Sequence, residues 1–275
     1  MSSNNNNEIN TGESILLEEL MGNGIFRLTL NDAKRRNALS EEMMAKLKSS
    51  LTDASDNKDI RVVIIAGNGP AFCSGHDLKQ MTAGRDSDDN GLAYFKKIFS
   101  SCSELMQMIV KHPKPIIAEV SGIAAAAGCQ LVACCDLAVA AMSARFITPG
   151  VNIGLFCSTP MVALSRNVSN KAAMEMLLTG EMVSAHKAER IGLVNRVTED
   201  ADLAQDTVSL AKLIASKSSL TLKIGKEAFY KQRDMPLSEA YDYASKVMVE
   251  NMLKHDAKEG ISSFLDKREP KWQDQ

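Results

Sequence analysis

Two short segments rich in small residues each follow a stretch that is typical of a buried strand. Residues 71–78 (AFCSGHDL) come after the apolar run 61–66, and residues 121–131 (SGIAAAAGCQL) come after the apolar run 116–120. Small residues let the backbone approach a ligand closely, and the second segment also opens a helix whose free N–H groups favour negative charge. Two such strand ends could form an oxyanion hole for a polarised carbonyl. Packing alone also selects small residues at such junctions, so spacing leaves both interpretations open.

The elements that must position these segments can be read from hydrophobic periodicity. Alternating or continuous apolar runs predict strands at 24–30, 61–66, 116–120, 137–141 and 193–197. Helical spacing predicts helices after an N-cap at Ser40 and at 92–109, 128–135, 158–167, 170–179 and 184–190. From about residue 203 the pattern is helical to the end, with a break near 234–236. Strands that alternate with helices predict an α/β core, followed by a helical C-terminal region.

Composition excludes several classes of function. The net charge of −2 gives no indication of a nucleic-acid partner, and no run approaches the roughly 20 apolar residues of a membrane span. The six cysteines form no C-x-x-C pair and the four histidines are scattered, so we expect no metal site and reduced, buried thiols. Residues 1–14, which include an asparagine run, are expected to form a disordered tail.

Four blocks resemble the enoyl-CoA hydratase/isomerase, or crotonase, family. They are residues 36–40 (RNALS), 71–78, 121–136 and 144–155, in the order and spacing of that family. The resemblance implies a crotonase (ClpP/crotonase) spiral of ββα units over residues 15–202. It also implies that the helical region 203–275 builds homotrimers, usually paired into hexamers. The ligand implied is a coenzyme A thioester, with no permanently bound cofactor.

The resemblance also assigns roles to individual residues. The backbone N–H groups of His76 and Ala127 would form the oxyanion hole for the thioester carbonyl. CoA would lie against a larger set of residues, namely Asn37, Ala38, Leu39, Ser74, Gly75, Asp77, Leu78, Gly128, Phe264 and Lys267. The RNAL residues would act largely through backbone, and Phe264 and Lys267 often serve a neighbouring subunit. Lys267 is equally explained as a solvated charge beside Arg268.

The resemblance fails at the positions that carry proton transfer. Hydratases of this family use two glutamates, and the matching positions here are Gln130 and Gly150. A third position, an acid/base in dienoyl-CoA isomerases, matches Ser158. Proton transfer near neutral pH needs a group that can accept and return a proton, and none of the three retains a carboxylate. Ala127 also replaces a residue that is usually glycine, which would strain the backbone if its φ were positive.

Other side chains are better explained by structure than by catalysis. The ring of His76 could titrate near neutral pH, but a packed histidine is favoured because the role of this position is its N–H. Cys157 lacks an oriented base and is expected to line the pocket. Asp77 and Asp136 are expected to support the loop and the following strand.

Three functions therefore stay open. The chain could bind acyl-CoA without efficient catalysis in fatty-acid metabolism, or catalyse non-standard chemistry such as decarboxylation, thioester hydrolysis or weak hydration. It could also be a non-catalytic regulatory or structural subunit. The resemblance is strongest to a mitochondrial branch, which implies a mitochondrial location. Residues 1–26 contain four glutamates and no Lys or Arg, which is unlike a transit peptide and leaves a cytoplasmic location as the alternative.

Overall fold

A six-stranded sheet forms the centre of the molecule. The computed structural model describes residues 14–275, so residues 1–13 of the expected tail lie outside the described residues. The strand order is β1-β2-β3-β4-β6-β9, with β1 antiparallel to β2 and the other neighbours parallel. Its strands are β1 (Leu16–Met21), β2 (Ile25–Leu30), β3 (Val62–Gly67), β4 (Ile116–Val120), β6 (Leu137–Ala141) and β9 (Arg196–Thr198). Parallel strands covered on both faces are continuously apolar, which explains why the run in β3 has no polar side chain.

A second, smaller sheet runs beside the first. It consists of β5 (Ile123–Ala125), β7 (Arg145–Ile147) and β8 (Val183–Ser184), in that order. A strand of the large sheet is followed by one of the small sheet in β4–β5 and again in β6–β7, and helices follow each pair. Isolated bridging of Cys73 with Ala124 adds the segment after β3 to the small sheet. This repetition of strand, strand and helix is the crotonase spiral that the sequence predicts.

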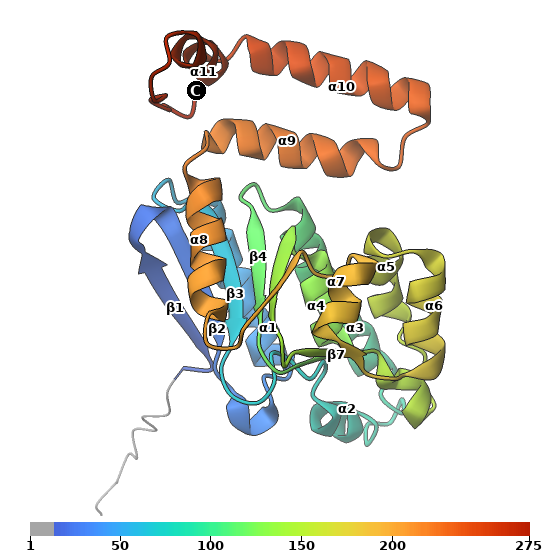
Figure 1. Cartoon of the computed structure of the whole chain (residues 1–275). Helices are drawn as coiled ribbons and strands as arrows, with labels where there is room; N and C mark the ends of the chain where they lie inside the picture. Colours follow the sequence, from blue (N-terminus) through green and yellow to red (C-terminus); the bar gives the residue numbers. More distant parts are fainter. Residues whose placement is uncertain (1–13) are drawn as a thin grey trace, which may run out of the picture.

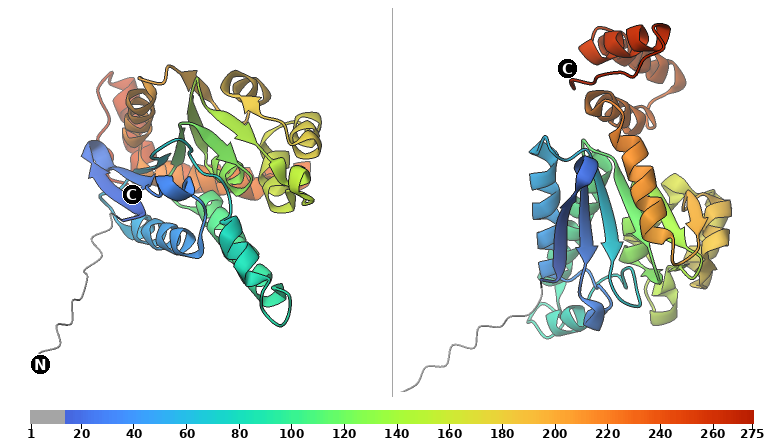
Figure 2. Two further views of the ribbon diagram at one scale, coloured as in Figure 1. Left: turned by 90° about the horizontal axis from the view of Figure 1, so that it is seen from below. Right: turned by 60° about the vertical axis from the view of Figure 1, so that its left-hand side comes forward.

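Helices cover both faces of the large sheet (Figure 1). On one face lies α8 (Leu203–Ala215), which contacts β2, β3, β4 and β6. The other face carries α1 (Glu41–Asp56), α3 (Leu92–Lys111) and α4 (Ala127–Cys134) (Figure 2). Against the second sheet packs α7 (Ala185–Ile191), which contacts β7 and β8. The remaining helices are α2 (Leu78–Gly84), which contacts α3, and η3 (Pro149–Ile153), α5 (Ser158–Asn167) and α6 (Asn170–Thr179), which contact one another or α4. The start of α1 follows from its N-cap, because Ser40 Oγ accepts a hydrogen bond from Met43 N at 3.2 Å.

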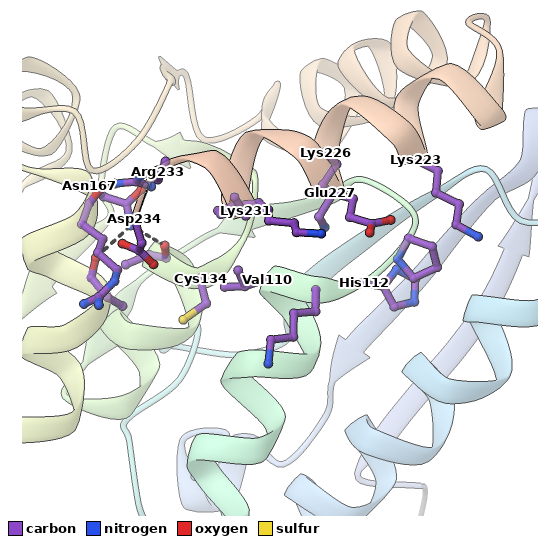
Figure 3. A pocket seen from close by; sticks show the side chains of 16 residues that line it. Val110, His112, Cys134, Asn167, Lys223, Lys226, Glu227, Lys231, Arg233 and Asp234 are labelled. Carbon is purple, nitrogen blue, oxygen red and sulfur yellow. Dashed lines mark hydrogen bonds between the residues drawn. The ribbon is translucent and has the colours of Figure 1, made fainter. Parts of the chain in front are cut away.

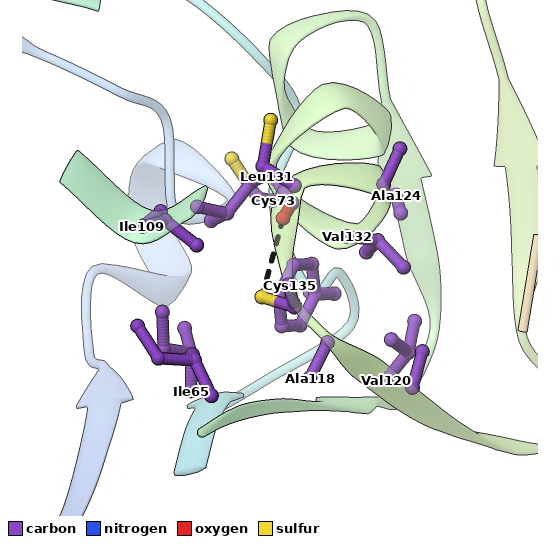
Figure 4. Close-up of a cluster of buried hydrophobic side chains, with 14 of the residues drawn as sticks. Ile65, Cys73, Ile109, Ala118, Val120, Ala124, Leu131, Val132 and Cys135 are labelled. Atoms are coloured by element: carbon purple, nitrogen blue, oxygen red, sulfur yellow. Dashed lines mark hydrogen bonds between the residues drawn. The ribbon is translucent and has the colours of Figure 1, made fainter. Parts of the chain in front are cut away.

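The core between sheet and helices is apolar and includes all six thiols. Figure 4 shows Ile65, Ala118 and Val120 of the sheet packed against Leu131 of α4 and Ile109 of α3. The six cysteines are free and buried, as expected from the sequence. Burial raises the pKa of several of these thiols to about 12, namely those of Cys73, Cys102, Cys129 and Cys134. They therefore pack as neutral apolar groups.

The C-terminal helices form an arm that stands away from the core (Figures 1 and 2). It comprises α9 (Ser219–Gln232), α10 (Leu237–Met252) and α11 (His255–Leu265). One anchor is Asp136, whose carboxylate accepts hydrogen bonds from Lys226 Nζ at 2.6 Å and Tyr230 Oη at 3.1 Å. A second is Asp274 near the C-terminus, whose carboxylate accepts from Arg61 Nη1 of the core at 2.9 Å and whose backbone N–H donates to Asp256 of α11. Asp136 thus has the structural role expected of it, although it ties down the arm as well as the strand that follows it.

The structure differs from the prediction mainly at short elements. The strands β1, β5, β7 and β8 and the helix α2 were not predicted. The last three strands and α2 are short, with two to three and seven residues, and β1 (LLEELM) is mostly exposed and lacks an alternation of apolar and polar residues. The strand predicted at 193–197 lies at 196–198, since Leu193 N instead bonds the carbonyl of Ala188 at 2.8 Å and ends α7. The predicted break at 234–236 is confirmed between α9 and α10. No helix in residues 14–275 is long and apolar enough to cross a membrane.

Candidate active site

The two glycine- and alanine-rich loops meet directly. Cys73 N donates to Ile123 O at 3.1 Å, and Ala125 N donates back to Cys73 O at 2.8 Å. A Cβ built on Gly128 would lie 2.1 Å from the carbonyl oxygen of Cys73, so only glycine fits there. A Cβ built on Gly75, whose φ is +90°, would lie 3.2 Å from the nitrogen of Ala127. The residue after Gly75 is His76, so the backbones of both predicted hole residues lie at one place.

The backbone N–H groups of His76 and Ala127 both lack a hydrogen-bond partner in the described residues. Ala127 is the first residue of α4, and the N–H groups of a first turn have no partner inside the helix. The positive end of the helix dipole adds to their attraction for a developing oxyanion. Two backbone donors without a protein partner, one of them at a helix N-terminus, are the groups that an oxyanion hole would require.

Backbone strain beside the hole lies at Ala126 rather than at Ala127. Ala127 is helical, so an alanine costs nothing there. Ala126, the N-cap, has φ 48° and ψ −114°, a region that side-chain-bearing residues rarely occupy. Its N–H donates to Ile147 O at 2.9 Å and its carbonyl accepts from Gln130 N at 3.0 Å, which holds this conformation. Such strain costs on the order of 1–3 kcal/mol and is found at functional sites.

The RNAL turn is built around the side chain of Asn37. Its Oδ1 accepts from Asp32 N at 2.8 Å, while Nδ2 donates to Asn68 O at 2.9 Å and Ala71 O at 2.8 Å. Arg36 and Asn37 both have positive φ, near 52°, which asparagine tolerates better than most residues. Because Ala38 and Leu39 are also buried, this turn can offer a ligand mainly backbone, as the resemblance implies.

The loop after Gly75 is fixed by Asp77 and borders solvent. Asp77 caps α2 by accepting from Lys79 N at 2.9 Å and Gln80 N at 3.2 Å, the supporting role expected for it. Ser74 N donates to Arg36 O at 3.0 Å, which joins this loop to the RNAL turn. Leu78 is 55% exposed. These residues lie together beside the hole, as do Gly75 and Gly128.

Phe264 and Lys267 lie elsewhere. They belong to or follow α11, at the end of the molecule opposite α2 (Figure 1). Phe264 is 82% exposed, and Lys267 has a positive φ beyond the helix end. Within one chain the structure therefore does not bring these two residues to the hole.

The first hydratase position, Gln130, is buried and unpaired. It lies on α4 one turn after Ala127 and is 4% exposed. Its Oε1 is buried and has no hydrogen-bond partner in the described residues. A neutral amide cannot act as a general base, so this position holds a polar group without proton-transfer chemistry.

The second hydratase position, Gly150, is filled by neighbouring chain. A Cβ there would lie 2.8 Å from Leu155 O and 2.9 Å from the sulfur of Cys157. The third position, Ser158, begins α5, and its hydroxyl donates to Phe156 O at 3.3 Å. Burial raises the pKa of the Cys157 thiol, which makes it a poor nucleophile at neutral pH. Packing therefore leaves no room for a side chain at residue 150 in this structure.

The imidazole of His76 packs against an aromatic ring. Its centroid lies 5.4 Å from that of Phe99 in an edge-to-face arrangement, and both ring nitrogens are buried without a protein partner in residues 14–275. Burial lowers the pKa of this imidazole below its ordinary value, so it is neutral at pH 7. This agrees with the expectation of a packed histidine.

A separate cavity that sequence reasoning did not predict lies under the C-terminal arm. It has a volume of about 600 Å³ and lies between α9 and the ends of α3, α4 and α5 (Figure 3). Lys226, Tyr230, Cys134 and Arg166 contribute to its walls, and no residue predicted for CoA does so. Its lining comes from four distant segments, so no local motif could have revealed it. The described residues hold no group of three or more His, Cys, Asp or Glu side chains that could bind a metal.

The two loops and the spiral fold together define the class of protein. The enoyl-CoA hydratase/isomerase family model matches residues 21–275, and the chain belongs to this family. It is 48% identical over 249 residues to enoyl-CoA hydratase domain-containing protein 3, mitochondrial, from both rat and human. These matches cover 90% of this chain and 81% and 80% of the relatives.

Solved structures agree with this assignment. The crystal structure of human enoyl-CoA hydratase domain-containing protein 3 has a TM-score of 0.89 at 45% identity, covering 94% of this chain and 100% of that one. An enoyl-CoA hydratase from Mycobacterium smegmatis gives a TM-score of 0.90 at 46% identity, covering 94% and 99%. The fold and family predicted from the sequence are therefore confirmed.

Proposed function

We propose that this protein binds the thioester group of an acyl-CoA between the N–H groups of His76 and Ala127, without two-carboxylate hydration. The observation that carries the proposal is the contact between the two loops, which leaves both N–H groups free at one point. The RNAL turn, Ser74, Gly75, Asp77, Leu78 and Gly128 would line the CoA path. The ligand would be supplied by fatty-acid metabolism, and no resident cofactor is needed.

The spectroscopic test of the hole uses the carbonyl itself. Acyl-CoA labelled with ¹³C at the thioester carbon should show a lower carbonyl stretching frequency when bound, because two N–H donors polarise the bond. Binding without a frequency shift would contradict the hole, and absence of binding to every CoA ester would end the proposal.

A pair of variants separates the N–H from the side chain. Ala127→Pro removes one donor at the first position of a helix, where proline is best tolerated, while Ala127→Gly keeps the N–H. The proline variant should bind at least tenfold more weakly than the glycine variant, with the frequency shift reduced. Circular dichroism of both variants checks that α4 and the sheet persist.

A second candidate is enolate chemistry without a protein base. The free N–H pair at the start of α4 is what would stabilise a thioester enolate, and loss of CO₂ generates an enolate directly. Release of CO₂ from malonyl-CoA or methylmalonyl-CoA, abolished by Ala127→Pro, would establish this function. Slow thioester hydrolysis would appear in the same assays as free thiol.

We further propose that the arm assembles the chain into homotrimers, or hexamers made of two trimers. Its helices expose many apolar side chains, among them Leu237, Met248, Leu253, Phe264 and Leu265, and α10 has no buried residue. Phe264 and Lys267 would then reach the CoA of a neighbouring subunit. Sedimentation analysis should show a trimer or hexamer that Leu253→Asp dissociates. A subunit that only supports assembly would show the oligomer without CoA binding.

We propose a mitochondrial location, supported by the names of the rat and human relatives, with a cytoplasmic location as the alternative. The whole chain fused at its C-terminus to a fluorescent protein should coincide with a mitochondrial marker. A diffuse signal outside mitochondria would favour the cytoplasm.

A further inference from the structure

A buried amide without a partner lies one helical turn from the proposed hole. Gln130 is 4% exposed, and its Oε1 has no hydrogen-bond partner among residues 14–275. An unpaired buried acceptor costs roughly 1–3 kcal/mol, so this side chain is not explained by the stability of the fold. Native structures retain such a group where a ligand or another polar group completes it.

The position of Gln130 on α4 places its side chain over the start of the helix. Side chains on a helix lean toward its N-terminus and lie over the residues three and four positions earlier. For Gln130 these are Ala127 and Ala126, the first residue and the N-cap of α4. The terminal torsion of glutamine is broad, so the amide can turn its oxygen toward a group that the ligand brings. An acyl chain whose carbonyl sits at Ala127 N would pass this amide with its first carbons.

Charge decides which polar group fits. An ionised carboxylate only accepts hydrogen bonds and could not satisfy Oε1, and it would need a buried cation. Among the fully buried side chains of the described chain there is no Lys or Arg. A hydroxyl is neutral and both donates and accepts, so it matches both ends of an amide. Saturated and enoyl chains offer nothing to pair with it.

We infer that Gln130 is a specificity-determining residue that selects acyl groups bearing a hydroxyl within three carbons of the thioester. This inference rests on the proposed binding of acyl-CoA at His76 and Ala127. An amide at this position, in place of a carboxylate, would recognise the hydroxyl group of the ligand and would not transfer a proton. Gln130 positions the ligand and takes no part in bond making or breaking.

Calorimetric titration of the whole protein tests this with five probes: butyryl-CoA, crotonyl-CoA, malonyl-CoA, 2-hydroxybutyryl-CoA and 3-hydroxybutyryl-CoA. The better hydroxybutyryl ester should bind about tenfold more tightly than butyryl-CoA, since one buried acceptor is completed. Equal affinities for these two esters, or tightest binding of malonyl-CoA, overturn the inference while leaving the proposed function intact. Absence of binding by all probes overturns both.

Two variants at the same position sharpen the test. Gln130→Leu keeps the size and removes the acceptor, so the hydroxyl preference should fall to within about twofold. Gln130→Glu keeps an acceptor oxygen in either protonation state, so the preference should persist. A preference retained by the leucine variant would overturn the inference. Thermal unfolding should show that Gln130→Leu is at least as stable as the unaltered protein, because an unpaired polar group has been removed.

Discussion

The loops around the hole and the helical arm are built in opposite ways. At the hole, a Cβ on Gly128 would strike the Cys73 carbonyl at 2.1 Å, so chain packing fixes the backbone of both loops. On the arm, a Cβ on Gly225 of α9 would meet nothing within 4 Å, and Leu253 is 82% exposed. The backbone of both loops is therefore fixed within one chain, whereas the arm carries exposed apolar surface. If the proposed binding and assembly hold, substitutions in the two regions should disrupt them separately.

Matched glycine substitutions give the largest expected contrast. Gly128→Ala should lower the free energy of unfolding by about 3 kcal/mol, because the methyl group meets rigid backbone, and should abolish acyl-CoA binding. Gly225→Ala should instead raise stability by up to about 1 kcal/mol, as expected for an open helix position. Urea unfolding of both variants measures this. If Gly128→Ala were as stable as the unaltered protein, the tight contact between the loops would be wrong.

The next largest effect is expected from breaking the ion pair between Lys226 of the arm and Asp136 of the core. Lys226→Met removes the cation that pairs with Asp136 at 2.6 Å, where the lysine side chain is 9% exposed. Leaving Asp136 without its partner should cost about 3 kcal/mol at pH 7. Binding of acyl-CoA by the folded fraction should persist, because this tether does not touch the hole. Urea unfolding combined with calorimetric binding separates the two effects, and an unchanged unfolding midpoint would contradict the tether.

Restoring the two carboxylates should not restore hydration. The double variant Gln130→Glu/Gly150→Glu places the second side chain where Leu155 O and Cys157 already lie, so we expect a loss of about 1–3 kcal/mol in stability. We also expect no measurable hydration of crotonyl-CoA, followed by absorbance of the enoyl thioester. Gln130→Glu alone is the control, since its site is not crowded by added atoms. Hydration by the double variant at the rate of an ordinary hydratase would falsify the claim that packing leaves no room for a working side chain at residue 150.

The strained backbone at Ala126 predicts a smaller change, namely a gain in stability when this residue becomes glycine. Ala126→Gly should raise the free energy of unfolding by about 1 kcal/mol, because relief of the positive-φ conformation exceeds the extra entropy of glycine in the unfolded chain. The same change at Ala127, which is helical, should lower stability instead. Thermal unfolding of both variants compares the two neighbours. Similar effects at the two positions would contradict the strained N-cap.

The smallest expected effect is a pH dependence of stability, which arises from His112 at the base of the arm. The buried ring of His112 meets Leu51 O through Nε2 at 3.0 Å, and Lys114 N donates to Nδ1 at 3.2 Å. Burial lowers the pKa of His112 below its ordinary value, and the nearby cations Lys114 and Lys226 lower it further. Because the unfolded chain binds the proton more readily, stability should fall as pH drops below about 6.5. His112→Asn should reduce the difference in unfolding free energy between pH 7.5 and 5.5.

The sequence allowed prediction of the parts of this molecule that depend on local pattern. The strands before both loops, the cap at Ser40 and the long helices follow from periodicity. The resemblance implies His76 and Ala127 as hole residues, and the structure brings their backbones to one place. The conformation of Ala126 could not be foreseen, because it is held by Ile147 from a strand of three residues. The crowding at Gly150 depends on a return of the chain at Cys157. The cavity under the arm and the separation of Phe264 from the hole required the arrangement of whole helices.

The crowding at Gly150 also has an evolutionary consequence. Because backbone at residue 155 occupies the space of a side chain at residue 150, a single substitution there meets a steric barrier before it can add chemistry. A path back to a two-carboxylate enzyme would first need a change in the segment 155–157, which by itself adds no catalytic group. Substitutions at residues 150 and 155–157 would therefore have to come in a fixed order, the backbone change before the carboxylate.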